Sequence, residues 1–292
     1  MQLVNYLISN YVIEMNVACI FPITNNYDKP NEIMEAFKTK IAPTLEKLGV
    51  NSTSIHMPGT SYVYLGVNEE LKGDPKGKCV IECLKALPDV NYAIMCDGSG
   101  KIPYEQVVDI FRFLISDSRL ACVMGNRIRN KSISNERYLI ERFEVFLLCK
   151  FFKHDKPIPD GQCGLWGFKI GEIKTDNSKY EKIKLTATGY EIELDLLSEV
   201  IGKGLQYAFL DIVLPAKNDG ITSSFKYDNN MSKMKALFKK YDRLEFFVPE
   251  FLDRFEKTQD FIDLVKNNAI ADFWRRYKTD LLSVVRQESE KS

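Results

Sequence analysis

The stretch Tyr92-Ala-Ile-Met-Cys96 is an apolar run that passes directly into Asp97-Gly-Ser-Gly-Lys101. A short run of this kind predicts a strand that is buried on both faces, as in a parallel sheet. An aspartate followed by small residues at the end of such a strand can present its carboxylate to a metal ion or a phosphate. Asp-Gly is also frequent in ordinary turns, so the local sequence leaves both interpretations open.

Further strands and helices alternate around this stretch. Apolar runs predict two more buried strands, Val17–Pro22 and Leu120–Gly125. Helical periods between the runs predict helices at Asn31–Leu48, Lys78–Leu87 and Tyr104–Ser116. This alternation predicts a doubly wound α/β fold, in which ligands bind beyond the carboxyl ends of the strands. We therefore expect one cleft to be lined by the segments that follow the strands, namely Pro22–Asn26, Asp97–Lys101 and Gly125–Arg129.

The second half of the chain has a less regular pattern. Glu136–Phe152 predicts an amphipathic helix rich in aromatic residues, and Pro157–Phe168 predicts a glycine-rich loop. Gly189–Ile201 predicts a helix that carries several acidic residues, and Leu205–Leu214 predicts a late strand. From Met231 onward the pattern is helical to the end of the sequence.

Composition limits the class of protein. The 292 residues suit one large domain or a domain with an appended module, and 40 basic residues balance 40 acidic ones. A nucleic-acid-binding protein would usually carry a basic excess, so we expect no nucleic acid partner. Five of the seven cysteines lie in apolar runs, which favours reduced thiols in a cytoplasmic protein. No apolar run approaches the ~20 residues that span a bilayer, and Met1–Ile13 lacks the early basic residues of a signal peptide.

The segment Tyr92–Glu105 resembles the central segment of the family 2 glycosyltransferases, especially the dolichyl-phosphate mannose and glucose synthases. Asp97, Pro103 and Glu105 match the first aspartate, the proline and the glutamate of that segment without a gap. Other elements of the family follow in order at Phe21–Asn25, Gly77-Lys78, Gly125-Asn-Arg127, Asp160–Gly164 with Phe168, Gly189–Leu194 and Asp211–Pro215. The resemblance covers roughly residues 16–216.

The resemblance implies a GT-A fold, which is an α/β, Rossmann-like fold with a mixed, mostly parallel sheet flanked by helices. It implies a catalytic domain at residues 16–216, with a nucleotide-binding half at about 16–127 and an acceptor half at about 128–216. Residues 1–15 would form an N-terminal extension, and residues 217–292 a helical C-terminal extension.

The activity that the resemblance implies is transfer of a sugar, with inversion, from a nucleoside-diphosphate sugar to a polyprenyl phosphate or a surface glycan. The donor would be bound by Pro22, Thr24, Asn25, Lys78, Asp97 and Ser99. The acceptor would be bound by Arg127, Arg137, Gln162 and Trp166, and catalysis would rest on Asp97, Lys101, Asp160 and Glu193.

Physical chemistry divides the acceptor residues by the kind of acceptor. The guanidinium groups of Arg127 and Arg137 suit a phosphate, which is already an anionic nucleophile and needs no base. A sugar hydroxyl needs a carboxylate base, for which Asp160, Glu191 and Glu193 are the candidates. The alternative for both groups is structural, as surface arginines and as a solvated acidic helix face. Trp166 either stacks on a sugar or fills the core.

Two departures from the family pattern concern the metal. Ser99 stands where the family has a second aspartate, and Lys101 stands at the polar residue that completes its metal site. One hypothesis is that Lys101 replaces the cation as a point charge on the departing diphosphate. A second is that Asp97 still binds Mg²⁺ or Mn²⁺ together with the diphosphate and water. A third is a catalytically degenerate domain that binds only nucleotide or partners.

The C-terminal sixty residues combine many aromatic residues with Lys and Arg. The aromatic residues are Phe246, Phe247, Phe251, Phe255, Phe261, Phe273 and Trp274. Three uses are open: packing against the catalytic domain, formation of a homodimer, and peripheral attachment to the inner face of a membrane that carries a lipid-linked acceptor.

Overall fold

The computed structural model describes residues 76–77, 80–81, 84, 92–96, 102, 104–127, 134–173, 183–213 and 227–290. Its strands are β1 (Tyr92–Cys96), β2 (Cys122–Arg127), β3 (Leu165–Lys169) and β4 (Tyr207–Ile212). Its longer helices are α6 (Tyr104–Ser116), α7 (Asn135–Phe151), α9 (Ile192–Gly202), α10 (Tyr227–Lys240), α11 (Leu244–Phe255) and α13 (Asn268–Ser289), and the shorter ones are α8 (Ile170–Ile173) and α12 (Gln259–Val265). The expected α/β class is confirmed in these residues.

The four strands form one mixed sheet in the order β1-β3-β2-β4. Strand β2 is parallel to β4, whereas β3 is antiparallel to both of its neighbours, β1 and β2. Consequently β1, β2 and β4 all run in the same direction, and β3 runs against them. The carboxyl ends of these three strands meet at one edge of the sheet, and Cys96 at the end of β1 pairs there with Leu165 at the start of β3.

Strand β3 lies inside the segment for which the sequence predicts a loop, so that prediction was wrong from Leu165 onward. The glycines of the segment suggested turns, but Gly167 sits in the sheet for a different reason. A Cβ atom at this position would lie 2.7 Å from Cγ2 of Ile110 in α6. The glycine is therefore required by the close approach of a helix, and the side chains around it are those of a buried strand.

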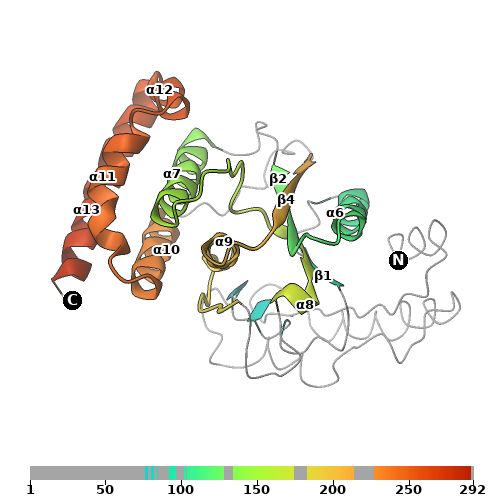
Figure 1. Ribbon diagram of the computed structural model, residues 1–292. Coiled ribbons are helices and arrows are strands. Elements are labelled where there is room, and N and C mark those ends of the chain that lie inside the picture. Colours follow the sequence, from blue (N-terminus) through green and yellow to red (C-terminus); the bar gives the residue numbers. More distant parts are fainter. Residues whose placement is uncertain are drawn as a thin grey trace, which may run out of the picture.

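The sheet separates two apolar layers, as expected from the alternation of side chains along each strand. Val123 and Leu165 face α6, where they pack with Ile110. Met124 and Trp166 face the other side, where α7, α9 and the C-terminal helices pack. Figure 1 shows these layers in the order α6, sheet, α7 with α9 and α10, and finally the helices α11 and α13.

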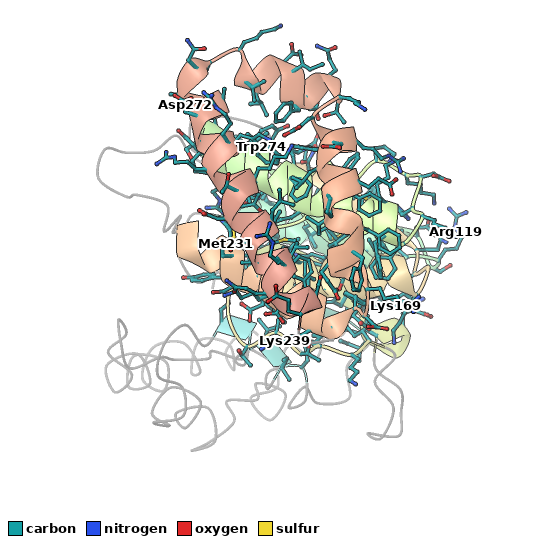
Figure 2. The ribbon with its side chains drawn as sticks, turned by 90° about the vertical axis from the view of Figure 1, so that its left-hand side faces the viewer. Arg119, Lys169, Met231, Lys239, Asp272 and Trp274 are labelled. Carbon is teal, nitrogen blue, oxygen red and sulfur yellow. The ribbon has the colours of Figure 1, made fainter. Side chains whose placement is uncertain are left out.

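The C-terminal helices cover an aromatic face of α7. The ring of Phe143 lies 5.4 Å from that of Phe255, 5.6 Å from that of Trp274 and 6.4 Å from that of Tyr277, all with edge-on geometry. Figure 2 looks onto this layer and shows α11 and α13 in front of α7, with Trp274 between the two helices. The aromatic face of α7, which the sequence indicated, is thus buried within the chain.

Most of the C-terminal aromatic residues therefore serve internal packing. Five are buried, namely Phe251, Phe255, Phe261, Phe273 and Trp274. Phe246 and Phe247 on α11 keep exposed fractions of 55% and 41%. Among the described helices, none combines the length and the apolar character needed to cross a membrane.

Candidate functional site

The candidate site lies at the edge of the sheet where β1, β2 and β4 end. Arg127 is the last residue of β2, and the loop that leads into β3 brings Asp160 and Gln162 to the same edge. Gly161 allows this loop to pass between α7 and α9, because a Cβ atom there would lie 2.6 Å from Cγ2 of Val145 and 2.8 Å from Cδ2 of Leu197. Packing of the two helices thus fixes the path of the loop.

Arg127 and Asp160 form a forked ion pair, although 33 residues separate them. Nε of Arg127 donates to Oδ2 of Asp160 at 2.6 Å, and Nη2 donates to Oδ1 at 2.8 Å. The backbone N–H of Arg127 donates to Oδ2 as well, at 3.0 Å. The side chains are only 9% and 7% exposed, so the pair is held away from bulk water. Two parallel bonds of this kind fix both position and orientation.

Glu141 of α7 extends this pair into a network of two cations and two anions. Its Oε2 accepts from Nη2 of Arg127 at 2.7 Å, and its Oε1 accepts from Nε of Arg137 at 2.6 Å. The charge of Arg127 is therefore balanced inside the protein by two carboxylates. Arg137 is the more accessible arginine, since its side chain is 23% exposed.

Two members of the network, Arg127 and Asp160, have shifted pKa values. Burial by itself would raise the pKa of Asp160, but the adjacent guanidinium of Arg127 and the hydrogen bonds donated by Arg127 and by the backbone of Gln162 outweigh it and hold the pKa below its ordinary value. Burial likewise opposes the charge of Arg127, yet Glu141 and Asp160 raise its pKa well above the ordinary value. Asp160 is thus a stable carboxylate, and a carboxylate of lowered pKa is a weak proton acceptor.

The other two candidate bases are also engaged. Glu193 is buried and forms an ion pair with Lys76. Glu191 accepts hydrogen bonds from the backbone N–H groups of Thr188 and Gly189, at 3.1 and 3.0 Å. The acidic residues at the start of α9 therefore do not form a solvated helix face, because each of these two carboxylates is bound to a lysine or to backbone N–H groups.

Gln162 connects the loop to two helices. Its Nε2 donates to Oε2 of Glu144 in α7, and its Oε1 accepts from Nζ of Lys233 in α10. Its backbone N–H donates to Oδ1 of Asp160 at 2.9 Å. Because one end of the amide donates while the other accepts, its orientation is determined by its two partners.

Glu144 is a buried titratable group with a raised pKa that the sequence did not predict as part of the site. The side chain is fully buried, and its Oε1 has no hydrogen-bond partner among the described residues. Burial raises the pKa of Glu144 to about 7, although Lys233 and the amide of Gln162 oppose the rise. The sequence did hold a signal, because Glu144 interrupts an apolar helix face next to Phe143.

Trp166 fills the core, which is one of the two roles left open by the sequence. The indole is 1% exposed, it stacks on Phe168 with ring centroids 5.9 Å apart, and its Nε1 donates to the backbone oxygen of Cys163 at 2.7 Å. In this conformation both faces of the ring are covered by protein, so the side chain offers no surface to a sugar.

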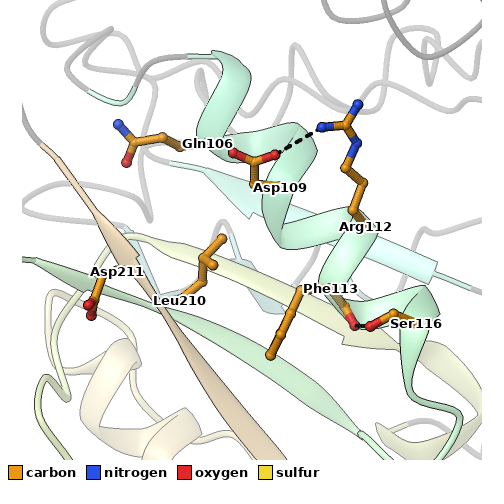
Figure 3. A pocket seen from close by; sticks show the side chains of 7 residues that line it. All are labelled: Gln106, Asp109, Arg112, Phe113, Ser116, Leu210 and Asp211. Atoms are coloured by element: carbon orange, nitrogen blue, oxygen red, sulfur yellow. Dashed lines mark hydrogen bonds and ion pairs between the residues drawn. The ribbon is translucent and has the colours of Figure 1, made fainter. Parts of the chain in front are cut away.

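An open hollow lies beside the site, between α6 and the end of β4 (Figure 3). The residues that line it are Gln106, Asp109, Arg112, Phe113, Ser116, Leu210 and Asp211. At its rim the amide of Gln106 pairs with the backbone of Val213, donating to the oxygen at 2.7 Å and accepting from the N–H at 2.9 Å. Asp211 is bound to the side chain of Asn126 at the end of β2.

The expected donor residues lie outside the described residues. They are Pro22, Thr24, Asn25, Lys78, Asp97 and Ser99, and Asp97 is also the expected metal ligand. The catalytic candidate Lys101 lies outside the described residues as well. Within the described ranges, no three His, Cys, Asp or Glu side chains are grouped so that they could hold a metal ion. The described residues thus include the residues expected to bind the acceptor, Arg127, Arg137, Gln162 and Trp166, together with the catalytic candidates Asp160 and Glu193.

Compared with known proteins, the chain matches no family model, no curated protein sequence and no solved structure.

Proposed function

We propose that the protein is an inverting glycosyltransferase that moves a sugar from a nucleoside-diphosphate sugar to a polyprenyl phosphate. The observation that carries the proposal is the forked pair of Arg127 and Asp160. It joins two of the segments that resemble the family, Gly125-Asn-Arg127 and Asp160–Gly164, at the edge where β1 ends. In open α/β sheets, ligands bind beyond the carboxyl ends of the strands. The two segments meet at such an edge, which supports a binding site there.

The arrangement of the carboxylates supports an anionic acceptor. A hydroxyl acceptor requires a free base within hydrogen-bond reach, and each carboxylate predicted for that task is bound to a cation or to backbone N–H groups. A phosphate monoester needs no base. Its oxygen attacks the anomeric carbon, a new C–O bond forms, and the bond to the diphosphate breaks so that nucleoside diphosphate leaves.

Arg127 and Arg137 take different parts in this proposal. Arg127 is neutralised by Asp160 and Glu141, and we assign it to holding the loop against the strand. Arg137 is bound to Glu141 through Nε and is more exposed, so we assign it to the acceptor phosphate. A lipid-linked acceptor places the transfer at a membrane surface, where Phe246 and Phe247 are exposed side chains suited to contact.

The donor side is tested by binding. Thermal unfolding is followed with a panel of nucleoside diphosphates and nucleotide sugars, each with Mn²⁺ and with a chelator. Because a ligand of the native state raises the melting temperature, one nucleotide class is expected to stabilise the protein, and Asp97→Ala is expected to abolish the effect. Asp272→Ala, at an exposed position on α13, is the matched control.

Dependence on chelator separates the two hypotheses for the diphosphate. A shift that persists with chelator supports Lys101 as the counter-charge, and a shift that requires Mn²⁺ supports a metal held by Asp97. Absence of a shift with every nucleotide overturns the proposal and leaves a domain that binds partners without catalysis.

The acceptor side is tested by transfer. Labelled sugar is expected to enter the organic phase when a polyprenyl phosphate is supplied, and Arg137→Gln is expected to raise the KM for that acceptor by roughly tenfold, the cost of one charge-assisted contact. Arg254→Gln, an exposed arginine on α11, is the control. Transfer to a glycan and not to the lipid would contradict the assignment of the acceptor.

A further inference from the structure

We propose that Lys233, from the C-terminal helix α10, positions the site loop through Gln162, so that the C-terminal helices are a working part of the candidate site. The fluorescence test of this inference stands without the proposed function, and only its activity test rests on that function. Lys233 donates to a side chain 71 residues earlier in the sequence, from a helix that follows the whole α/β part.

Lys233 is buried, and burial of an ammonium group is energetically unfavourable, so its hydrogen bond to Gln162 calls for an explanation. The residue is 8% exposed, and a buried ammonium group loses its hydration unless polar partners replace it. An apolar side chain would fill the same space without that loss. Lys233 donates a hydrogen bond to the amide oxygen of Gln162, in the loop that carries Asp160, and it also interacts electrostatically with the carboxyl of Glu144.

A continuous set of contacts leads from Lys233 to the edge of the sheet. Lys233 holds the side chain of Gln162, and the backbone of Gln162 donates to Asp160. Asp160 in turn grips Arg127 at the end of β2. Every step is a hydrogen bond or an ion pair between buried groups, which is the kind of network that transmits a change of position.

The cluster around Gln162 also keeps polar atoms without partners. Oε1 of Glu144 and Nδ2 of Asn230 make no hydrogen bond among the described residues. Asn230 precedes Lys233 by three residues on α10, so the two side chains share a face of the helix. Buried polar atoms are normally hydrogen-bonded, so each one left open calls for an explanation, and a functional role is one of the recognised explanations.

Lys240 of the same helix provides an internal contrast. Its Nζ pairs with Asp195 and Glu199 of α9, and it touches no residue of the Asp160–Cys163 loop in these contacts. Both lysines hold α10 to the α/β part, but only Lys233 reaches the site. Substitution of either one therefore disturbs the same helix, and only substitution of Lys233 should alter the loop.

Trp166 makes this difference measurable without any substrate. The chain contains two tryptophans, so Trp274→Phe leaves Trp166 as the sole indole reporter. Its Nε1 donates to the backbone oxygen of Cys163, in the loop that carries Asp160 and Gln162. In the Trp274→Phe protein, Lys233→Met is expected to shift the emission of Trp166 and to increase its quenching by acrylamide, and Lys240→Met is expected to leave both at the parent values.

The activity readout follows the same logic. Loss of positioning is expected to lower kcat/KM for transfer by about tenfold to a hundredfold in Lys233→Met, since small displacements of reacting groups are costly. Lys240→Met is expected to retain the parent value at a temperature where both variants are folded. If the parent protein transfers no sugar, the proposed function fails, and the fluorescence comparison still decides the role of Lys233.

Unchanged Trp166 emission and quenching in a folded Lys233→Met protein would overturn the inference. If Lys233→Met does not fold, Lys233→Arg is compared with Lys240→Arg, because arginine keeps the charge and changes the geometry. A shift of Trp166 in the first and not in the second supports positioning through Gln162. Equal spectra of the two arginine variants overturn it.

Discussion

Helix α10 buries a charge at each of two places, and the surroundings of the two differ. Near its end, Lys240 meets Asp195 and Glu199, whose carboxylates also accept the backbone N–H groups of Thr186 and Lys184, both at 2.7 Å. Two turns earlier, the hydrogen bond described for Lys233 goes to the neutral amide oxygen of Gln162. The nearby carboxyl of Glu144 keeps one oxygen without a hydrogen-bond partner in the described structure.

The electrostatic consequences differ in the same way. Burial opposes the charges around Lys240, but the ion pairs prevail: the pKa of Lys240 is raised and that of Glu199 is lowered. These groups stay charged over the whole physiological range. At the other place burial prevails and raises the pKa of Glu144 to about 7. The ion pair of Lys240 with Glu199 therefore keeps its charges at all physiological pH values, whereas the charge near Lys233 changes with pH as Glu144 titrates.

The comparison is tested most severely by Lys240→Met. Removing one partner of a buried ion pair leaves uncompensated charge, and here two carboxylates lose their cation, so we expect a loss of roughly 3–5 kcal/mol in the free energy of unfolding. Urea denaturation at pH 7 measures it. A loss below about 1 kcal/mol would mean that the carboxylates find other compensation, for instance from Lys203, which lies 3.4 Å from Glu199.

Titration of Glu144 provides the next largest effect. Glu144 binds its proton more tightly in the folded state than in the unfolded chain, where a glutamate has its ordinary pKa of 4.5. Stability should therefore fall as the pH rises from about 4.5 to about 7. The free energy of unfolding should fall by roughly 3 kcal/mol in total, and above the pKa of Glu144 in the folded state this contribution to stability is absent. Unfolding free energies at several pH values measure the slope.

Glu144→Gln isolates this contribution. The variant is expected to lack the decrease between pH 5 and pH 7, and therefore to exceed the parent in stability at pH 8, because glutamine carries no charge to bury. Opposing contributions from carboxylates of lowered pKa, such as Asp160, cancel in the difference between the two proteins. Glu250→Gln, an exposed acid on α11, is the control, and parallel curves for the parent and Glu144→Gln would disprove the assignment.

The smallest effect concerns a neutral member of the Lys240 region. The hydroxyl of Ser198 donates to the backbone oxygen of Asp195 at 2.7 Å and lies 2.6 Å from the hydroxyl of Tyr241. Ser198→Ala is expected to cost about 1 kcal/mol in urea denaturation, the usual net value of a buried hydrogen bond. Thr279→Ala, at an exposed position on α13, should change stability by less than about 0.5 kcal/mol. Equal losses for Ser198→Ala and Thr279→Ala would show that the buried hydroxyl of Ser198 contributes no more to stability than an exposed one.

Much of the described fold could be predicted, because periodicity is a local property. The strand at Tyr92–Cys96 and the helix at Tyr104–Ser116 have the predicted limits, and the helix predicted at Glu136–Phe152 lies within one residue of its limits in the structure. A continuous apolar run or a helical period of apolar residues identifies such elements whatever surrounds them. Strand β3 escaped because a glycine needed for close packing looks like a glycine needed for a turn.

The site could be predicted only in part. Sequence motifs brought Arg127, Asp160 and Gln162 forward together, and the structure places them in contact. Their bonding was out of reach, because partners such as Lys233 lie on a helix far along the chain. Whether an arginine is a free cation or a neutralised one depends on such distant carboxylates and ammonium groups, and no local pattern encodes them.

The approach of Gly167 to Ile110 also limits how this sequence can change over generations. A side chain at position 167 would collide with Ile110 while that residue keeps its Cγ2 branch. A smaller residue at 110 must therefore arise first, and by itself it leaves a cavity that lowers stability. Two positions that are far apart in the chain thus share one mutational history, in which the order of the steps is set by steric overlap.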